Sequence, residues 1–290
     1  MSLIVVGVDG SAHADAALRW AVDEADRCDA TVLAVMAWSS LDPHRARGRQ
    51  ASDQAHGEAG AREALRTAVA GVASARPVEQ RVVCDSPVSA LLEAGTAADL
   101  VVVGARGVGG FTGLLLGSVS ERVVEQARTP VVVVREGAER PASGPVVVGI
   151  DGSAASVEAL HWAAAEAGRR RAPLEVVHAW RIPPCGAPPT PSMITVLQEA
   201  ARHTLDQALA DPALAGVDAD GHLGCGGATQ RLVYAAQDAS LVVVGTHGKG
   251  ALQRVVLGST SRQLAHHTPC PLVVVPPSSR RPGARSDHRS

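Results

Sequence analysis

Two glycine-rich stretches of this chain have the residue types that can hold a phosphate group. The first contains Gly104, Gly107, Gly117 and Ser118, and the second contains Gly245, Gly248, Gly258 and Ser259. Each has the spacing G-x2-G-x9-G-S, follows an apolar run that predicts a buried strand, and precedes a helical pattern. Glycine has no Cβ, so phosphate oxygens can approach main-chain N–H groups, and the first turn of a helix favours an anion. The two stretches predict a duplicated phosphate-binding loop and, with it, nucleotide binding.

An ordinary strand-to-helix turn is the alternative explanation for a single glycine loop. In the first stretch, Ser118 and Glu121 have the spacing of a capping box, which would explain the serine without a ligand. In the second stretch, Arg262 stands three residues after Ser259, so no such box can form. The glycine-serine element is retained without its capping partner, which favours a ligand. The hydroxyls of Ser118 and Ser120 would then add hydrogen bonds.

A second shared motif lies near the start of each copy. Gly7-Val8-Asp9-Gly10-Ser11 returns as Gly149-Ile150-Asp151-Gly152-Ser153, at an offset of 142 residues. An aspartate or serine just after a strand is often a helix N-cap. Where the strand order of a parallel sheet reverses, however, Asp9 and Asp151 would accept hydrogen bonds from ribose hydroxyls or an adenine amine.

The duplication covers whole domains. All four tryptophans pair at the offset of 142 residues, Trp20 with Trp162 and Trp38 with Trp180, while the glycine loops are offset by 141. Solenoid repeats are only about 20 to 50 residues long, so this period indicates two copies of a complete domain. We expect a first nucleotide-binding domain at residues 1–136, a linker at 137–144, a second domain at 145–276 and a disordered tail at 277–290.

Short apolar runs alternate with longer helical patterns in both halves. The expected strands are Leu3–Val8, Thr31–Ala37, Val78–Cys84, Leu100–Val103 and Val131–Val134, then Pro145–Ile150, Leu174–Ala179, Asp218–Leu223, Leu241–Val244 and Leu272–Val275. The helices expected between the first five are Ala14–Ala25, Gly60–Val72, Val88–Ala97 and Val119–Ala127. Continuously apolar strands are covered on both faces, which predicts an α/β class with a parallel sheet. The strand order 3-2-1-4-5 would make the two polar loops neighbours, and 2-1-3-4-5 is the alternative.

The composition narrows the possible partners and location. A net charge of −2 with interspersed signs gives no field that would select nucleic acid or an anionic membrane. No stretch of about 18 apolar residues is present to cross a bilayer. The five cysteines, Cys28, Cys84, Cys185, Cys225 and Cys270, lack the spacing of a metal site. The chain opens directly into a strand pattern, and we expect a soluble cytoplasmic protein with reduced thiols.

These motifs together resemble the universal stress protein family, in the tandem-domain form found in actinobacteria. The resemblance is carried by the GVDGS motif, by the G-x2-G-x9-G-S spacing and by the run from Gly113 to Ser120, and both halves contain both motifs. It covers nearly the whole chain outside the linker and tail. It implies two tandem flavodoxin-like or Rossmann-like domains, each a five-stranded parallel sheet of order 3-2-1-4-5 with helices on both faces. It also implies one bound ATP per domain, with or without Mg.

The resemblance assigns nucleotide contacts by position. In the first half they are Gly7, Val8, Asp9, Ala37, Val103, Gly104, Ala105, Arg106, Gly107, Gly117, Ser118, Val119 and Ser120. In the second half they are Gly149, Ile150, Asp151, Ala179, Val244, Gly245, Thr246, His247, Gly248, Gly258, Ser259, Thr260 and Ser261. The residues before the glycine loops would flank adenine and ribose, and those of the loops would line ribose and phosphates.

The two copies depart from each other at three places. His247 replaces Arg106, Gly250-Ala251 replaces Gly109-Gly110, and Ser240 replaces Asp99. The first departure changes how phosphates are neutralised, so we expect the two sites to differ in affinity.

The sequence shows no evident catalytic apparatus. It lacks G-x4-G-K-[ST], and Lys249 is not followed by the hydroxyl that would hold magnesium. A single loop histidine such as His247 is more often hydrogen-bonded or solvated than catalytic, and a helix dipole explains His266 and His267. We expect a nucleotide-dependent stress-response regulator that acts on an unidentified protein. The alternatives are a slow ATPase or nucleotidyl-transfer enzyme on the same scaffold, and a structural module without nucleotide.

The fifth strands give an expectation about assembly. Val131–Val134 and Leu272–Val275 are apolar edge candidates, and an uncovered edge of this kind invites pairing. We expect the two halves to pair as an intramolecular pseudo-dimer and two chains to form a homodimer, and the family resemblance implies the same.

Overall fold

The protein is described by a computed structural model over residues 2–38, 51–72, 74, 76–107, 116–138, 144–183, 188–248 and 257–277, with only the backbone for 51–56. The predicted tail beyond residue 277, most of the predicted linker, Cys185 and the Gly109-Gly110 and Gly250-Ala251 pairs lie outside these ranges. Contacts divide the chain into two compact units, Met1–Glu139 and Arg140–Ser290.

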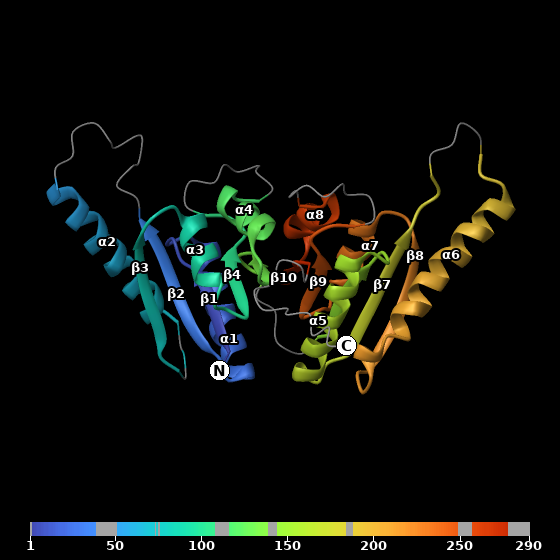
Figure 1. Ribbon diagram of the computed structural model, residues 1–290, viewed down its shortest axis with the longest axis horizontal. Coiled ribbons are helices and arrows are strands. Elements are labelled where there is room, and N and C mark those ends of the chain that lie inside the picture. The colour runs from blue at the N-terminus through green and yellow to red at the C-terminus, as the bar shows by residue number, and fades with distance from the viewer. Residues whose placement is uncertain are drawn as a thin grey trace, which may run out of the picture. The chain divides into compact units, whose positions relative to one another are not determined.

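The first unit alternates strands and helices along the chain (Figure 1). Its elements are β1 (Leu3–Gly7), α1 (Ala12–Cys28), β2 (Thr31–Trp38), α2 (Ala51–Ala70), β3 (Val78–Cys84), α3 (Pro87–Gly95), β4 (Leu100–Gly104), α4 (Ser118–Gln126) and β5 (Val131–Val134). Strand β1 pairs in parallel with β2 on one side and with β4 on the other, and β3 and β5 complete the sheet. The order β3-β2-β1-β4-β5 makes the turns after β1 and β4 neighbours, so the alternative order 2-1-3-4-5 does not apply.

The second unit repeats this arrangement. Its elements are β6 (Val146–Ile150), α5 (Ala154–Arg170), β7 (Leu174–Trp180), α6 (Pro191–Leu209), the 3-10 turn η1 (Pro212–Leu214), β8 (Ala219–Cys225), α7 (Ala228–Ala235), β9 (Leu241–Gly245), α8 (Ser259–His267) and β10 (Leu272–Val275). The parallel pairings give the order β8-β7-β6-β9-β10. The predicted α/β class is confirmed in both units.

Helices cover both faces of each sheet. In the first unit α1 packs on β1, β4 and β5, α2 packs on β2 and β3, and α3 packs on β1 and β2 beside α4. Right-handed crossovers place α1 and α2 on one face and α3 and α4 on the other. Because helices cover β1 and β4 on both faces of the sheet, Val5, Val6 and Val102 are fully buried and form the centre of the core.

Two predictions about the elements were wrong. Helix α2 begins at Ala51, well before the predicted start at Gly60, because residues 51–59 have no apolar period but contain the strong helix formers Ala, Gln and Glu. Strand β3 is not covered on both faces, since Glu79, Gln80 and Arg81 are exposed, as suits the edge of a sheet.

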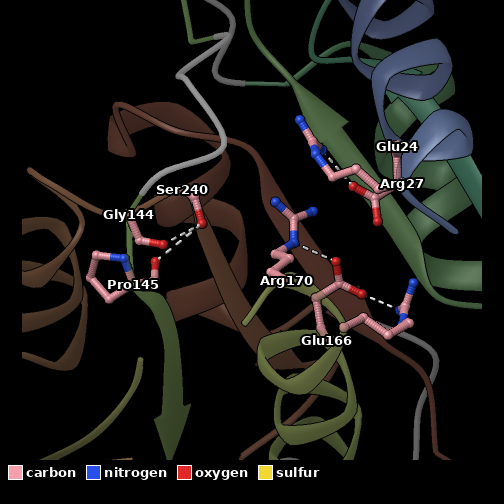
Figure 2. Close-up of polar contacts among 8 residues, drawn as sticks. Glu24, Arg27, Gly144, Pro145, Glu166, Arg170 and Ser240 are labelled. Atoms are coloured by element: carbon pink, nitrogen blue, oxygen red, sulfur yellow. Dashed lines mark hydrogen bonds and ion pairs between the residues drawn. The ribbon is translucent and has the colours of Figure 1, made fainter. Parts of the chain in front are cut away.

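Helices α1 and α5 each bury a glutamate at equivalent positions. The exposed fraction is 3% for Glu24 and 1% for Glu166. Arg27 donates to Glu24 over 2.9 Å, and Glu166 accepts hydrogen bonds from Arg169 and Arg170 (Figure 2). A buried carboxylate is costly without such partners, so an arginine three residues later is part of the packing of both helices.

The difference between Asp99 and Ser240 follows from a proline. In the first unit the N–H of Leu3 donates to Asp99 Oδ2 over 2.9 Å. The equivalent of Leu3 is Pro145, which has no N–H to donate. In its place the Ser240 hydroxyl donates to the carbonyl oxygens of Gly144, at 2.9 Å, and Pro145, at 3.3 Å (Figure 2). Position 99 holds an acceptor and position 240 holds a donor because Leu3 has an N–H and Pro145 has none. These contacts lie at the start of the first strand of each unit, away from the glycine loops.

His13 ties helix α1 to the chain that leaves β5. The N–H of Glu136 donates to His13 Nδ1 over 2.8 Å, which requires an unprotonated Nδ1. Burial lowers the pKa of His13 below its ordinary value, and the nearby Arg106 lowers it further, against an opposing effect of Glu136. The second unit has Ala155 at the equivalent position, so this contact belongs to the first unit alone.

We expect Ser240→Asp to destabilise the protein. A carboxylate at this position would face two carbonyl oxygens and no N–H, and an unsatisfied buried group costs about 1–3 kcal/mol, more when charged. The free energy of unfolding from denaturant titration measures the loss. A change below about 0.5 kcal/mol, the usual scatter of surface substitutions, would show that the proline does not dictate the serine.

We expect His13→Asn to reduce the loss of stability in mild acid. Because the folded-state pKa of His13 is lowered, the unfolded chain binds a proton that the folded chain refuses, so stability falls as the pH drops below about 6.5 toward the folded pKa. Asparagine keeps an acceptor for Glu136 N–H but does not titrate. Between pH 7.5 and 5.5, the free energy of unfolding should fall more for the wild type than for the variant. Parallel curves would contradict the assignment.

Candidate functional site

A pocket of about 430 Å³ opens at the carboxyl ends of β1 and β4 in the first unit. It is lined by Gly7, Val8, Asp9, Ala14, Val35, Ala37, Pro87, Leu91, Val103, Gly104, Arg106, Gly107, Gly117, Ser118, Val119 and Ser120. The residues from β2 and α3 are apolar, whereas the turn after β4 and the first turn of α4 contribute N–H groups, hydroxyls and a guanidinium. The volume is within the range of roughly 300–1,000 Å³ that is usual for small-ligand pockets.

The turn after β1 holds its aspartate in a fixed orientation. Asp9 Oδ1 accepts a hydrogen bond from the N–H of Ser11 over 3.0 Å, across Gly10, whose φ of +81° favours glycine. Ser11, not Asp9, is the N-cap of α1, and its hydroxyl accepts from the N–H of Ala14 over 3.2 Å. The N-cap alternative for Asp9 is therefore wrong, and its carboxylate is one of the groups that line the pocket.

The turn after β4 fits closely against the turn after β1. A Cβ on Gly104 would lie 2.7 Å from the carbonyl carbon of His13, which is main chain and cannot give way cheaply. A Cβ on Gly107 would fall directly on Asp9 Oδ2. The Ser11 hydroxyl also lies 3.3 Å from the carbonyl oxygen of Arg106. The main-chain approach requires glycine at position 104, whereas a Cβ at Gly107 would displace the Asp9 carboxylate.

Helix α4 presents an uncapped N-terminus to the pocket. Its N-cap is Gly117, and no side chain in the described part of the chain caps it. Because Gly117, not Ser118, is the N-cap, the capping box predicted as an alternative for Ser118 and Glu121 is not formed. The hydroxyl of Ser120 donates to the carbonyl oxygens of Ala105, at 3.0 Å, and Gly117, at 2.9 Å, so it holds the turn in shape. The N–H groups of the first turn, left without a side-chain acceptor, suit an anion.

Arg106 supplies a positive charge to the same pocket. Its guanidinium makes no hydrogen bond or ion pair with any residue that the structure describes. A guanidinium has five N–H donors and stays charged at every physiological pH. Its presence beside the open helix end makes this end of the pocket suited to a phosphate or carboxylate.

Four residues that line the pocket were not predicted from the sequence, and Ala105, predicted as a nucleotide contact, does not line it. Val35, Ala14, Pro87 and Leu91 line the pocket but belong to no loop motif. Ala105 is buried instead. Leu91 packs against Gly7 on β1, where a Cβ would lie 3.0 Å from Leu91 Cδ1, and no spacing in the sequence signals this contact.

The second unit brings its equivalent residues together with the same backbone contacts. Asp151 Oδ1 accepts from Ser153 N–H at 3.0 Å, and a Cβ on Gly248 would lie 2.5 Å from Asp151 Oδ2. Gly258 is the uncapped N-cap of α8, and its N–H donates to the carbonyl oxygen of Thr246 over 3.0 Å. Strand β6 carries Gly149 and Ile150, β7 carries Ala179, β9 carries Val244 and Gly245, and the first turn of α8 carries Ser259, Thr260 and Ser261.

Two features of the second unit had no counterpart in the sequence analysis. His178, on β7, is buried and its Nδ1 lies 2.9 Å from the carbonyl oxygen of Ile150. His247 Nδ1 lies 2.9 Å from Thr246 Oγ1, while His247 Nε2 is buried and has no hydrogen-bond partner among the described residues. Neither contact follows from spacing, because both depend on how the histidine ring turns after folding.

The described residues form neither a membrane-spanning helix nor a metal-binding cluster. The described helices include none with the length and apolar character that a bilayer crossing needs. In the described part of the chain, no three side chains of His, Cys, Asp or Glu gather closely enough to hold a metal ion.

Comparisons with known proteins agree with this architecture. The model of the universal stress protein family matches the chain twice, at residues 1–135 and 143–276. A universal stress protein of Mycolicibacterium smegmatis is 35% identical over 295 residues, which cover 94% of this chain and 97% of that protein. Universal stress protein Rv2005c of Mycobacterium tuberculosis is 34% identical over 285 residues, covering 93% and 96%.

A solved structure has the same fold along nearly the full length. The crystal structure of a universal stress protein from Archaeoglobus fulgidus covers 94% of this chain and 98% of its own, with a TM-score of 0.62 and 18% identity. At this identity the likeness is one of fold. With two matches to the family model and relatives that share a third of its residues, the chain belongs to the universal stress protein family.

Proposed function

We propose that the chain binds an adenine nucleotide, ATP, in each half and acts as a nucleotide-dependent regulator in the stress response. The observation that carries the proposal is the first pocket, where the Arg106 guanidinium and the N-terminus of α4 meet at the end of an apolar slot, neither of them bound by a side chain of the described residues. The identity of the base as adenine comes from the family resemblance, whereas the repetition of the site in the second unit is supported by the duplicated motifs and their matching backbone contacts.

The apolar part of the pocket suits a purine base. Val8, Val35, Pro87 and Leu91 form its walls, and flat apolar ligands are held mostly by such burial. Asp9 lies between this part and the glycine turn, so its carboxylate would accept a hydrogen bond from a ribose hydroxyl.

The polar part of the pocket suits the phosphates. Main-chain N–H groups at Gly107 and in the first turn of α4 would donate to phosphate oxygens, together with the Ser118 hydroxyl. Arg106 would neutralise part of the phosphate charge, and its fork of donors matches phosphate geometry. The groups that line this part of the pocket are suited to holding phosphates, and binding is the function that we assign.

Regulation requires only that the nucleotide binds one state of the protein better than another. We propose that this state is read by a regulatory protein partner, and that the chain works as a homodimer. Sedimentation equilibrium with and without ATP measures both the oligomeric state and its dependence on nucleotide.

ATP should raise the melting temperature of the purified protein, because a ligand of the folded state stabilises it by mass action. Gly117→Asp combined with Gly258→Asp should abolish this shift. Aspartate suits the N-cap backbone, with φ of −69° and ψ of 149° at Gly117, yet its carboxylate would repel phosphates. A Cβ there would lie 3.3 Å from Ala105 O, a contact that a small shift relieves.

The matched control for this pair is Gly117→Ser with Gly258→Ser, which adds an uncharged cap. It should keep a thermal shift with ATP. A wild-type protein that carries no adenine nucleotide and melts at the same temperature with and without ATP or AMP would overturn the proposed function.

Gly107→Ala should weaken nucleotide binding at the first site without unfolding the unit. The new Cβ would push the Asp9 carboxylate out of its place beside Gly107, and a flexible side chain can move where backbone cannot. Losing a hydrogen bond to a charged group corresponds to about tenfold or more in affinity. Calorimetric titration measures it, with Gly60→Ala as the control, since a Cβ at Gly60 meets nothing within 4 Å. Equal affinities for the two variants would remove Asp9 from the site.

A further inference from the structure

The two copies of the glycine turn share a backbone but differ in charge. The N–H of Gly117 donates to the carbonyl oxygen of Ala105 over 2.8 Å, and the N–H of Gly258 donates to that of Thr246 over 3.0 Å. Ser11 Oγ lies 3.3 Å from the carbonyl oxygen of Arg106, and its equivalent in the second unit is Ser153, which lies 3.5 Å from that of His247. These matched contacts show that positions 106 and 247 are the same place in two copies of one turn.

The side chains at that place are held in different ways. The Arg106 guanidinium lines the first pocket and has no hydrogen-bond or ion-pair partner among the described residues. The His247 ring is folded back onto its own turn, with Nδ1 at 2.9 Å from Thr246 Oγ1. Its Nε2 is buried and unpartnered in the part of the chain that the structure describes. The first turn therefore offers a permanent cation, and the second offers a shorter ring held by a hydroxyl.

Two neighbouring substitutions change the second turn in the same direction. Thr246 replaces Ala105, and its hydroxyl is the group that holds His247. Thr260 replaces Val119, which lines the first pocket in the first turn of α4. The second turn has thus lost a guanidinium and gained two hydroxyls. That of Thr246 is buried and holds the His247 ring, and that of Thr260, in the first turn of α8, would donate a hydrogen bond to phosphate without adding charge.

We infer that the two sites differ in the number of phosphates that they favour: the first discriminates for the polyanionic ATP over AMP, and the second binds the two with more similar affinity. The inference rests on the proposed function of nucleotide binding. Each further phosphate adds negative charge near Arg106, whose attraction grows with that charge, whereas a hydroxyl such as that of Thr260 donates about equally to one phosphate or three. A single chain then responds separately to the amount of nucleotide and to its phosphorylation.

The test isolates each site and compares AMP with ATP. Gly258→Asp should block the second site and leave only the first able to bind nucleotide, and Gly117→Asp should do the reverse. Each substitution adds a carboxylate beside the phosphates of the site that it blocks. Calorimetric titration in magnesium-free buffer gives the ratio of the AMP dissociation constant to the ATP dissociation constant. A charge-assisted hydrogen bond is roughly twice as strong as a neutral one, so we expect this ratio to be about tenfold larger at the first site.

Exchanging the two side chains then assigns the difference. Arg106→His at the isolated first site should lower the ratio to that of the second, and His247→Arg at the isolated second site should raise it. Should His247→Arg fail to fold, judged by its thermal unfolding curve, the smaller substitution Arg106→His decides the outcome alone. Arg122→His, which removes an exposed arginine of α4 outside the pocket lining, should leave the first-site ratio unchanged.

Lys249 provides the control for the second site, because it follows the glycine turn but lies outside the described residues. Lys249→Met at the isolated second site should leave the ratio unchanged. A large fall in the ratio would overturn the inference, because it would show that Lys249 supplies a cation to that site. Equal ratios at the two isolated sites, or ratios that the exchange of residues 106 and 247 does not move, would overturn it as well. An absence of any binding at both sites would overturn the proposed function together with the inference.

Discussion

The close approach of two turns determines the shape of the first pocket. Gly104, at the end of β4, lies so near the carbonyl group of His13 that no Cβ fits between them. This contact brings the first turn of α1 against the turn after β4, and the Ser11 hydroxyl fastens it by lying 3.3 Å from the carbonyl oxygen of Arg106. Asp9 and Gly107 meet only because the two turns touch. A parallel sheet with β1 beside β4 is what makes the approach possible.

The second unit shows which parts of this arrangement are needed for folding. Gly245, the equivalent of Gly104, approaches the main chain as closely, since a Cβ on it would lie 2.6 Å from the carbonyl oxygen of Ala155. Ala155 stands at the position of His13. The contact is between main chains, so the side chain at His13 is free to differ. Asp99 and Ser240 differ for the opposite reason: Pro145 removed a donor, and the partner changed from acceptor to donor to keep the strand start satisfied. The main-chain geometry is the same in both units, and the side chains differ according to which main-chain donors and acceptors need a partner.

The sequence was sufficient for the fold because its strongest signals are periodic and punctuated. Apolar runs at the central strands predicted their places, since strands buried on both faces need such runs. The edge strand β3 and the first turns of α2 were predicted less well, because exposure removes the apolar pattern and leaves only propensity. The glycine and aspartate positions that now meet around one pocket were predicted from spacing. Leu91 and Pro87 were not, because they reach the pocket from α3, and only the packing of that helix on β1 brings them there.

The structure also separates serines that the sequence treated alike. Ser118 and Ser120 stand two residues apart in the first turn of α4, and both were predicted to bind phosphate. The Ser120 hydroxyl donates to the carbonyl oxygens of Ala105 and Gly117, and the Ser261 hydroxyl donates to that of Gly245, one residue earlier in its own turn. A hydroxyl used in this way fixes the N–H groups of the turn and need not touch a ligand to matter for binding. In a site built from main-chain donors, the residues that hold the main chain in place are as necessary as those that face the ligand.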